Sequence, residues 1–362
     1  MAEVTTAMVK ELRELTGAGV LNCKKALVEC DGDMDAAVEV LRKKGEATAV
    51  KKASRIAAEG IVRVAVKDGT AVIVEVNSET DFVAKNEKFQ NFVDAIVDQI
   101  FTSDAATVEE LMEEQWKADP SKTVREALVN MVATIGENIT LRRFAKIKTG
   151  NLVVPYIHGA GRIGVLVEAE AANNDVNVEA LKNIAMQIAA MNPQYVSRSE
   201  MSDEEIAKLR EITVDSALNT PDTLPKPILL KLIGRAVAEK LWSEEDIAAY
   251  EEQKNNLNYL FNFLSKAAKA KAAELAMEDK AAIAADKIFS GLVEGRVAKQ
   301  LKEICLLDQT YVKAEDGKQT VEKYLESVDK NFKIVKAIRF ETGEGIEKKE
   351  ENFAEEVAKQ MM

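Results

Sequence analysis

The spacing of apolar residues over positions 1–54 predicts three short helices. In the first helix, apolar side chains recur every three or four residues, at Val4, Met8, Leu12 and Leu15. We expect Asn22 to cap the second helix and Asp33 the third, because short polar side chains accept hydrogen bonds from the free amides at a helix start. Gly45 is expected to end the third helix. So small a helical core is marginal alone, which is typical of a docking module tethered to a larger body.

The spacing changes from that of a helix to that of a strand over residues 61–76. Apolar side chains alternate with others on both sides of Asp68-Gly69, which is typical of a β-hairpin with a tight turn. A helix with one apolar face is predicted shortly after the hairpin. Its stripe consists of Phe89, Phe92, Val93, Ile96 and Ile100.

Two further helices are predicted by capping boxes, in which a Thr precedes a Glu by three residues. The pairs are Thr107 with Glu110 and Thr123 with Glu126. We expect the two helices to reach about Trp116 and Ile135, before the chain returns to a strand over 136–150.

A second hairpin-plus-helix unit is predicted over residues 151–191. The stripe of its helix is Leu181, Ile184, Ile188 and Met191. We expect the helix to stop at Asn192-Pro193, because the residue before a proline disfavours the helical conformation. Residues 71–81 and 164–175 both read as a strand, a polar turn and a helix start. Duplication of one α+β unit explains this likeness. A chance recurrence of the same local sequence pattern explains it equally well.

From residue 202 to about 304 the chain is predicted to be almost entirely helical. Ser202 begins this region with another capping box, and the stretch NTPDTLPKP at 219–227 interrupts it. Residues 265–289 are rich in Ala and Lys, so their apolar surface is small. We therefore expect a helical hairpin or an extended arm rather than a globular core.

The chain is predicted to end with a strand over 332–338 and a helix over 352–360. The whole pattern indicates an α+β fold with a hairpin-plus-helix core and a long helical segment. We expect the chain to divide into five structural segments, with the bounds 1–54, 55–148, 149–201, 202–304 and 305–362.

Composition narrows the range of partners and locations. The 362 residues carry a formal net charge of -12, which disfavours nucleic acid as the main partner because phosphate binding uses clustered Lys and Arg. No leader is seen, and no run of about 20 apolar residues could cross a bilayer. We expect a cytoplasmic protein without membrane contact. Its three cysteines show no C-x-x-C spacing, so neither a disulfide framework nor a zinc site is indicated.

The residues give little support to an enzyme. His158 is the only histidine, and no motif for nucleophilic, nucleotide-hydrolysing or zinc-dependent catalysis occurs. The stretch GAGRIG at 159–164 is a weak phosphate-loop candidate, because it joins two predicted strands. Two alternatives stay open at this point. One is an enzyme using paired carboxylates such as Glu75 and Glu79, and the other is an RNA- or ribosome-associated binding factor.

Six stretches together resemble the elongation factor Ts family of bacterial translation. They are VKELRELTGAGVLNCKKAL, NSETDFVAKNEKF, IGENITLRR, HGAGRIGVLV, VEGRVAKQ and IRFETGEGIEKKEENFAEEVA. The resemblance implies a guanine nucleotide exchange factor that binds elongation factor Tu, in its GDP-bound and nucleotide-free forms, and has no cofactor or metal of its own. It also implies a ubiquitin-associated-like three-helix domain, a core of two similar hairpin-plus-helix halves, a coiled-coil-like arm and a C-terminal strand-plus-helix module.

The resemblance also implies roles for single residues. Thr80, Asp81, Phe82 and Val83 correspond to the segment that dislodges the Mg²⁺ of elongation factor Tu. Arg13, Lys24, Ile135, Gly136 and His158 become candidate contacts to the same partner.

From the residues alone, most of these positions have a simpler interpretation. Thr80 and Asp81 read as a helix cap, and Phe82 reads as a core aromatic. The other candidates read as a solvated helix face, a helix end and a turn.

The helical segment at about 205–285 looks longer than the family's arm. A lineage-specific addition, a second contact to the partner and a dimerisation surface all fit it. The sequence leaves the oligomeric state open.

Overall fold

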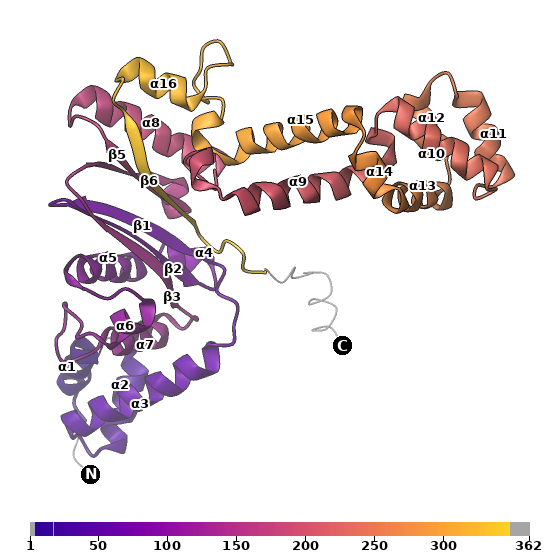
Figure 1. Cartoon of the computed structure of the whole chain (residues 1–362). Coiled ribbons are helices and arrows are strands. Elements are labelled where there is room, and N and C mark those ends of the chain that lie inside the picture. Colours follow the sequence, from indigo (N-terminus) through magenta and orange to yellow (C-terminus); the bar gives the residue numbers. More distant parts are fainter. Residues whose placement is uncertain (1–3, 17, 348–362) are drawn as a thin grey trace. The chain divides into compact units, whose positions relative to one another are not determined.

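The computed structural model describes residues 4–16 and 18–347. It divides into two compact units (Figure 1). The first unit is formed by the chain up to Asn192 and again from Tyr324, and the second is Pro193–Lys323. The first unit is α+β, with N-terminal helices and two three-stranded antiparallel sheets, and the second is helical. The helix expected over 352–360 lies outside the described residues.

Three helices open the first unit, as the apolar spacing predicts. They are α1 (Thr6–Thr16), α2 (Val20–Glu29) and α3 (Met34–Lys52). Their buried side chains include Leu12, Cys23 and Leu27. Asp33 caps α3 as expected, because its carboxylate accepts a hydrogen bond from the amide of Ala36. The expectation for Asn22 was wrong: α2 already begins at Val20, which places Asn22 inside its first turn.

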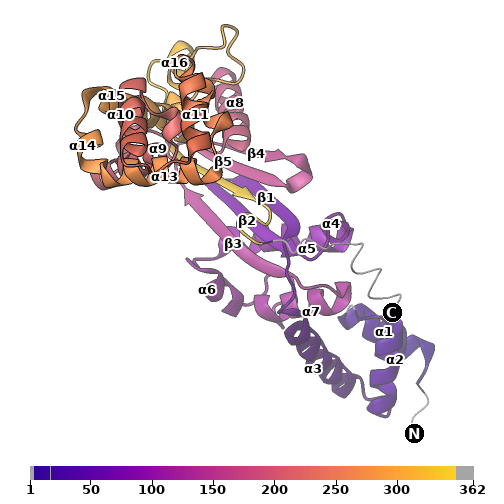
Figure 2. The ribbon, with the colours of Figure 1, turned by 90° about the vertical axis from the view of Figure 1, so that its right-hand side faces the viewer.

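Gly45 does not end the third helix, because α3 continues seven residues further to Lys52. Helix α3 lies alongside α7 (Val124–Ile135) (Figure 2). Gly45 is buried on α3, and Ala49, one turn later, packs against the main core, the cluster of buried apolar side chains that includes Val74, Phe89 and Val132. A Cβ atom at Gly45 would lie 3.6 Å from that of Ala133. Tertiary contact thus outweighs the cost of about 1 kcal/mol that an interior glycine carries.

The first sheet has the strand order β1-β2-β3. Its strands are β1 (Glu59–Lys67), β2 (Thr70–Ser78) and β3 (Thr140–Lys148). The predicted turn at Asp68-Gly69 is confirmed. Both residues have positive φ, 49° and 71°, the conformation of the two-residue turn whose twist matches that of the strands.

Helices α4 (Asp81–Ala84), α5 (Glu87–Thr102), α6 (Val108–Glu113) and α7 lie between β2 and β3 in the chain. The whole predicted stripe of α5 is buried in the main core. Both capping boxes are formed. Helix α7 ends at Ile135 as expected, whereas α6 ends at Glu113, before Trp116. Trp116 is buried against Phe92 instead.

The second sheet has the strand order β4-β5-β6. Its strands are β4 (Leu152–His158), β5 (Ile163–Glu170) and β6 (Lys333–Glu341), with the short 3₁₀ turn Gly159–Gly161 between the first two. Helix α8 (Asp175–Met191) follows β5, and α16 (Val321–Val328) precedes β6. Met191, the last member of the predicted stripe, is exposed. The two sheets approach so closely that a Cβ at Gly164 would lie 2.4 Å from Val62 Cγ1.

The second unit is built around a pair of long helices. Its helices are α9 (Asp203–Leu218), α10 (Lys226–Ala238), α11 (Glu244–Gln253), α12 (Leu257–Phe263), α13 (Lys266–Glu278), α14 (Lys280–Ala284) and α15 (Lys287–Ile304), with 3₁₀ turns at Arg198–Glu200, Pro221–Thr223 and Leu306–Asp308. Helices α9 and α15 lie side by side (Figure 1). An ion pair of 2.8 Å between Arg210 and Glu294 links them. The capping box of Ser202 with Glu205 is formed.

Residues 265–289 contribute to a buried core, whereas their small apolar side chains predict a helical hairpin or an extended arm rather than a globular core. Helix α13 buries Ala268, Ala272 and Leu275 in a core shared with α10 and with Trp242. The indole nitrogen of Trp242 donates to the carbonyl of Ala268 at 3.1 Å. Small side chains allow helices to approach closely, so this segment packs into a compact cluster.

None of the helices within residues 4–16 and 18–347 combines the length and apolar character that crossing a membrane requires.

Candidate functional site

The Thr80 turn, defined as Thr80–Val83, joins β2 to the main core. Thr80 has an extended backbone and caps α4, because its hydroxyl accepts from the amide of Val83 at 3.4 Å. Helix α4 has only four residues, of which Val83 and Ala84 are buried. Phe82, one position earlier, is 79% exposed. The interpretation of Thr80 as a cap is therefore correct, and the interpretation of Phe82 as a core aromatic is wrong.

Asp81 carries a negative charge at the exposed edge of this turn. Its carboxylate pairs with the ammonium group of Lys85, one helical turn later, at 2.6 Å. The hydrogen bond from Lys85 holds the pKa of Asp81 below its ordinary value. Asp81 is therefore ionised at neutral pH, and its partner is an exposed side chain that water can replace.

A second turn holds the first. Its residues, Gly136–Asn138, connect α7 to β3, and we call it the Glu137 turn. The carboxylate of Glu137 accepts two hydrogen bonds from Thr80, from the backbone N–H at 3.0 Å and from the hydroxyl at 2.7 Å. In the reverse direction, the carboxylate of Glu79 accepts from the backbone N–H of Asn138 at 2.6 Å. The Glu137 turn thus satisfies donors of Thr80, and Glu79, the residue before Thr80, satisfies a donor of the Glu137 turn.

The end of α3 joins the same contacts. Arg55 pairs with Glu79 at 3.3 Å, and its backbone carbonyl accepts from the side-chain amide of Asn138 at 2.8 Å. The ammonium group of Lys52 donates to the carbonyl of Gly136. The N-terminal helices and the Thr80 turn are therefore connected through the Glu137 turn.

The other predicted site residues lie on several elements. Ile135 is half-buried against the main core, and Gly136 follows it in the left-handed conformation with φ of 87°. These two residues lead directly into the Glu137 turn. Arg13 and Lys24 are exposed on α1 and α2, and His158 is exposed at the end of β4, on the other sheet.

Arg13 and Lys24 share their helices with exposed leucines, whereas His158 lies near a hydroxyl group. Leu15 and Leu21 are also exposed on the two helices that carry Arg13 and Lys24. The ring nitrogen Nδ1 of His158 lies 3.2 Å from the hydroxyl of Tyr156.

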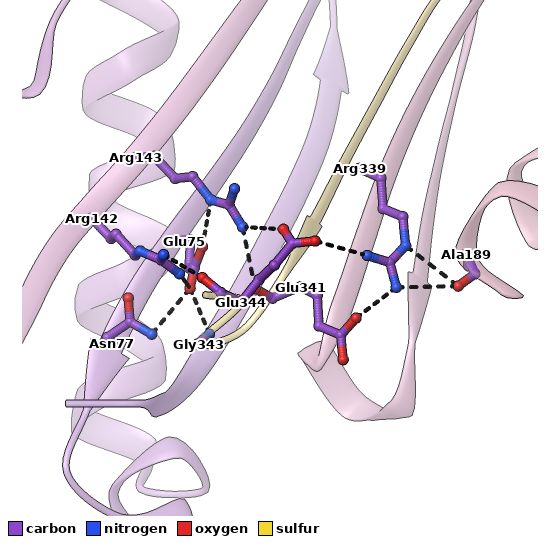
Figure 3. Close-up of polar contacts among 9 residues, drawn as sticks. All are labelled: Glu75, Asn77, Arg142, Arg143, Ala189, Arg339, Glu341, Gly343 and Glu344. Atoms are coloured by element: carbon purple, nitrogen blue, oxygen red, sulfur yellow. Dashed lines mark hydrogen bonds and ion pairs between the residues drawn. The ribbon is translucent and has the colours of Figure 1, made fainter. Parts of the chain in front are cut away.

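Glu75 and Glu79, the carboxylate pair of the enzyme alternative, belong to separate networks. Glu75 is fully buried on β2 and pairs with Arg142 at 3.0 Å and with Arg143 at 2.6 Å (Figure 3). It also accepts from the side-chain amide of Asn77 at 3.1 Å and from the backbone N–H of Gly343 at 2.8 Å. With its oxygens so engaged, Glu75 is a structural anion rather than an acid or a base.

The Glu75 network ties the two sheets to each other. Arg143, on β3, reaches the carboxylate of Glu344 at 3.1 Å, and its guanidinium group lies 4.2 Å from the ring centroid of Phe340 on β6. Arg339, also on β6, donates to the carbonyl of Ala189 at the end of α8 (Figure 3). In the described part of the chain, no group of three or more His, Cys, Asp or Glu could hold a metal ion.

Sequence reasoning missed Glu137 and Asn138 as parts of this site. The contact between Thr80 and Glu137 spans 57 positions, so no local spacing announces it. The available signal was the stretch IGENITLRR, which carries the family resemblance and contains both residues.

Comparison with known proteins gives full-length relatives. A model of the family "Elongation factor TS" matches residues 79–344. Elongation factor Ts of Clostridium novyi (strain NT) is 43% identical over 366 residues, which cover 99% of each chain. That of Clostridioides difficile (strain 630) is 43% identical and covers 100% of each. Elongation factor Ts of Halothermothrix orenii is 42% identical over 355 residues, 98% of this chain and 97% of the relative.

These matches decide between the alternatives that the sequence left open. Proteins of this family are exchange factors rather than enzymes, and they act in the cytoplasm during translation elongation. An RNA- or ribosome-associated factor and a carboxylate enzyme are thereby set aside. The chain belongs to the elongation factor Ts family, the nucleotide exchange factors of elongation factor Tu.

Proposed function

We propose that the Thr80 turn is the part of this exchange factor that disturbs the Mg²⁺ site of GDP-bound elongation factor Tu. The observation that carries the proposal is the exposure of Phe82, at 79%, directly beside Val83, at 8%. An exposed aromatic side chain is a candidate for burial by a partner, because aromatic residues are enriched in protein–protein interfaces. It has few rotamers to freeze, so it suits insertion into another protein.

The chemistry of the partner's site explains why a wedge is sufficient. A GTPase holds GDP through backbone amides, a Lys and a Mg²⁺ that bridges phosphate and protein oxygens. Displacing the Mg²⁺ removes the largest positive charge next to the phosphates. The exchange factor therefore needs only to bind a conformation of the partner in which these contacts are disturbed. The nucleotide itself need not be touched.

Asp81 supports the same role. It is ionised, and it sits one position from the exposed aromatic ring. A carboxylate carried toward a Mg²⁺ site competes for the hard cation or repels the oxygens that bind it. Because Lys85 is an exposed partner, its ion pair with Asp81 is easily exchanged for a contact on elongation factor Tu.

The remaining candidates would hold the partner while the turn acts. In this proposal residues 1–54 are the ubiquitin-associated-like docking module, with Arg13 and Lys24 among its contacts. Exposed Leu15 and Leu21 on the same helices support this assignment. Ile135, Gly136 and His158 would add contacts from the core.

The proposed domain layout follows the segments expected from the sequence. The core halves are 55–148 and 149–201, the arm is 202–304, and 305–362 completes the core and forms the C-terminal module. The matching strand orders of the two sheets support the two halves. Helices α5 and α8, which follow the second strand of each sheet, support them as well.

Thermodynamic linkage sets a limit on the mechanism. If the factor lowers the affinity of elongation factor Tu for GDP, then GDP lowers the affinity for the factor by the same ratio. Tight binding to the nucleotide-free form and release upon reloading are therefore two aspects of one coupling.

The test follows release of a fluorescent GDP analogue from elongation factor Tu at catalytic amounts of this chain. We expect Phe82→Ala and Asp81→Ala each to lower the release rate by about ten-fold or more, the scale of an interface hot spot. Excess Mg²⁺ should slow the wild-type factor more than either variant. Unchanged rates in both variants would place the activity outside the Thr80 turn.

A further inference from the structure

The Thr80 turn has little structure of its own. Helix α4 has four residues, one turn of helix. A single turn fixes several backbone dihedrals for one or two hydrogen bonds, so it is unstable without outside support. The side chain of Phe82 points into solvent, which means that its own packing does not set its direction. The direction of Phe82 depends on the backbone that carries it.

Glu137 supplies the outside support at the start of this turn. One carboxylate oxygen accepts the backbone N–H of Thr80 at 3.0 Å, and the other accepts its hydroxyl at 2.7 Å. The hydroxyl hydrogen is thus committed to Glu137, which leaves the lone pairs of the oxygen free to face the amide of Val83. Glu137 therefore completes the cap of α4 through Thr80.

The base of Glu137 is itself fixed. The next residue, Asn138, donates its backbone N–H to Glu79 and its side-chain amide to the carbonyl of Arg55. Lys52 holds the carbonyl of Gly136 on the other side. Hydrogen bonds to charged groups are stronger than hydrogen bonds between neutral groups. These contacts therefore hold the backbone around Glu137 firmly in place.

We infer that Glu137 is a positioning residue for nucleotide exchange, which fixes the Thr80 turn so that Phe82 is held in its inserting direction before the partner binds. This inference rests on the proposed function of the Thr80 turn. In the proposed function other contacts hold the partner, so the order of this turn affects the insertion of Phe82 that speeds GDP release rather than the initial docking. A turn ordered in advance does not lose conformational freedom at that insertion step. Glu137 need not touch the partner to act in this way.

A merely structural role for Glu137 makes a different prediction. In that case, substituting Glu137 would lower the stability of the fold as much as substituting any other half-buried carboxylate that accepts a hydrogen bond from a hydroxyl. Glu114 offers the matched control. It is also half-buried in the first unit, and it accepts from the hydroxyl of Ser103 at 2.7 Å and from the side-chain amide of Gln99 at 2.9 Å. None of these groups belongs to the Thr80 turn.

The experiment measures release of fluorescent GDP from elongation factor Tu over a range of concentrations of the full chain. It separates the release rate at saturation from the concentration of factor that gives half of it. We expect Glu137→Ala to lower the saturating rate by about five- to twenty-fold, the effect of losing hydrogen bonds to a charged acceptor. The half-saturating concentration should change by less than about three-fold.

The control and the milder variant complete the series. Glu114→Ala should leave both kinetic values unchanged, and thermal unfolding compares its stability with that of Glu137→Ala. Glu137→Gln keeps one acceptor oxygen for Thr80 and should give an intermediate saturating rate. It also carries the test if the alanine variant does not fold. Equal rates for wild type, Glu137→Gln and Glu137→Ala would overturn the inference, and so would a loss confined to the half-saturating concentration.

A double-mutant cycle with Phe82 distinguishes the two proposals. If Glu137 acts through Phe82, then Glu137→Ala should cause little further loss in a Phe82→Ala background. Additive losses would show that Glu137 acts elsewhere. If Phe82→Ala itself has no effect, the proposed function of the turn fails. If Phe82→Ala slows release and Glu137→Ala does not, only the positioning role fails.

Discussion

Strand β2 and the turn that follows it break the usual rule of burial at two places, in opposite directions. Glu75, a charged residue, is fully buried, and Phe82, an aromatic residue, is 79% exposed. Only seven positions separate them. The buried charge finds its partners inside the chain, in Arg142, Arg143 and the backbone of Gly343. The exposed ring has no comparable cover, and we propose that elongation factor Tu supplies it.

In the proposed function, one strand serves two purposes. The Glu75 network joins the sheets and gives the strand a fixed base. The Thr80 turn, at the end of the same strand, presents an exposed apolar group for the partner to bury. A violation of the burial rule therefore has different meanings according to whether partners exist within the chain. Stability measurements and exchange measurements should separate the two sites.

The largest expected effect is that of Glu75→Ala. The substitution leaves the guanidinium groups of Arg142 and Arg143 without their shared anion and frees the backbone N–H of Gly343. We expect a loss of about 3 kcal/mol in the free energy of unfolding. This value is at the lower end of the range for a broken buried ion pair, because both arginines are partly exposed. Urea unfolding measures it.

The control for this prediction is Glu113→Ala, which removes an exposed partner of Arg125. This variant should unfold at the same urea concentration as wild type. Equal midpoints for Glu75→Ala and Glu113→Ala would show that the buried network does not stabilise the fold.

The adjacent residues Phe82 and Val83 give the next largest effect and the sharpest comparison. Val83→Ala removes two methyl groups from the main core and should cost about 1–2 kcal/mol of unfolding free energy. Phe82→Ala should change stability by less than about 0.5 kcal/mol, because its ring is exposed, while it slows GDP release. The same unfolding curves measure both variants. A Phe82→Ala variant less stable than Val83→Ala would mean that the ring packs against its own chain.

The smallest expected effect concerns the charge of Asp81. Lys85→Met removes the hydrogen bond that lowers the pKa of Asp81, so the pKa should rise toward its ordinary value. A lowered pKa means that the pair contributes to stability above the ordinary carboxyl pKa and loses this contribution as the pH falls through the folded value. Carboxyl-carbon NMR titration measures the shift. An unchanged pKa would show that Asp81 and Lys85 do not pair in solution.

Local patterns accounted for much of the fold. The Asp68-Gly69 hairpin, the apolar stripe of α5 and all three capping boxes were predicted from neighbouring residues, because hydrogen bonds and periodicity within a few positions determine them. Helix boundaries predicted from a single capping residue were less successful. Asn22 lies inside α2, and Gly45 lies inside α3, because packing against α7 extends that helix.

The candidate site was found in the sequence only in part. Thr80–Val83 could be named because the surrounding stretch resembles a known family, and the cap at Thr80 could be predicted from residue type. The contacts that hold this turn join positions far apart in the chain, such as Glu137 with Thr80 and Asn138 with Arg55. A single sequence contains no periodicity that pairs such residues.

The sequence by itself determined the order and type of the elements up to α8, the family, and the presence of Phe82 after a strand. These properties depend on neighbours in the chain and on the identity of each residue. The tertiary structure decided three further properties. It buries Glu75 between two arginines, completes the second sheet with β6 after the second unit, and exposes Phe82 on a turn held by Glu137. The physical reason is that burial and hydrogen bonding are settled by which surfaces meet when the chain folds.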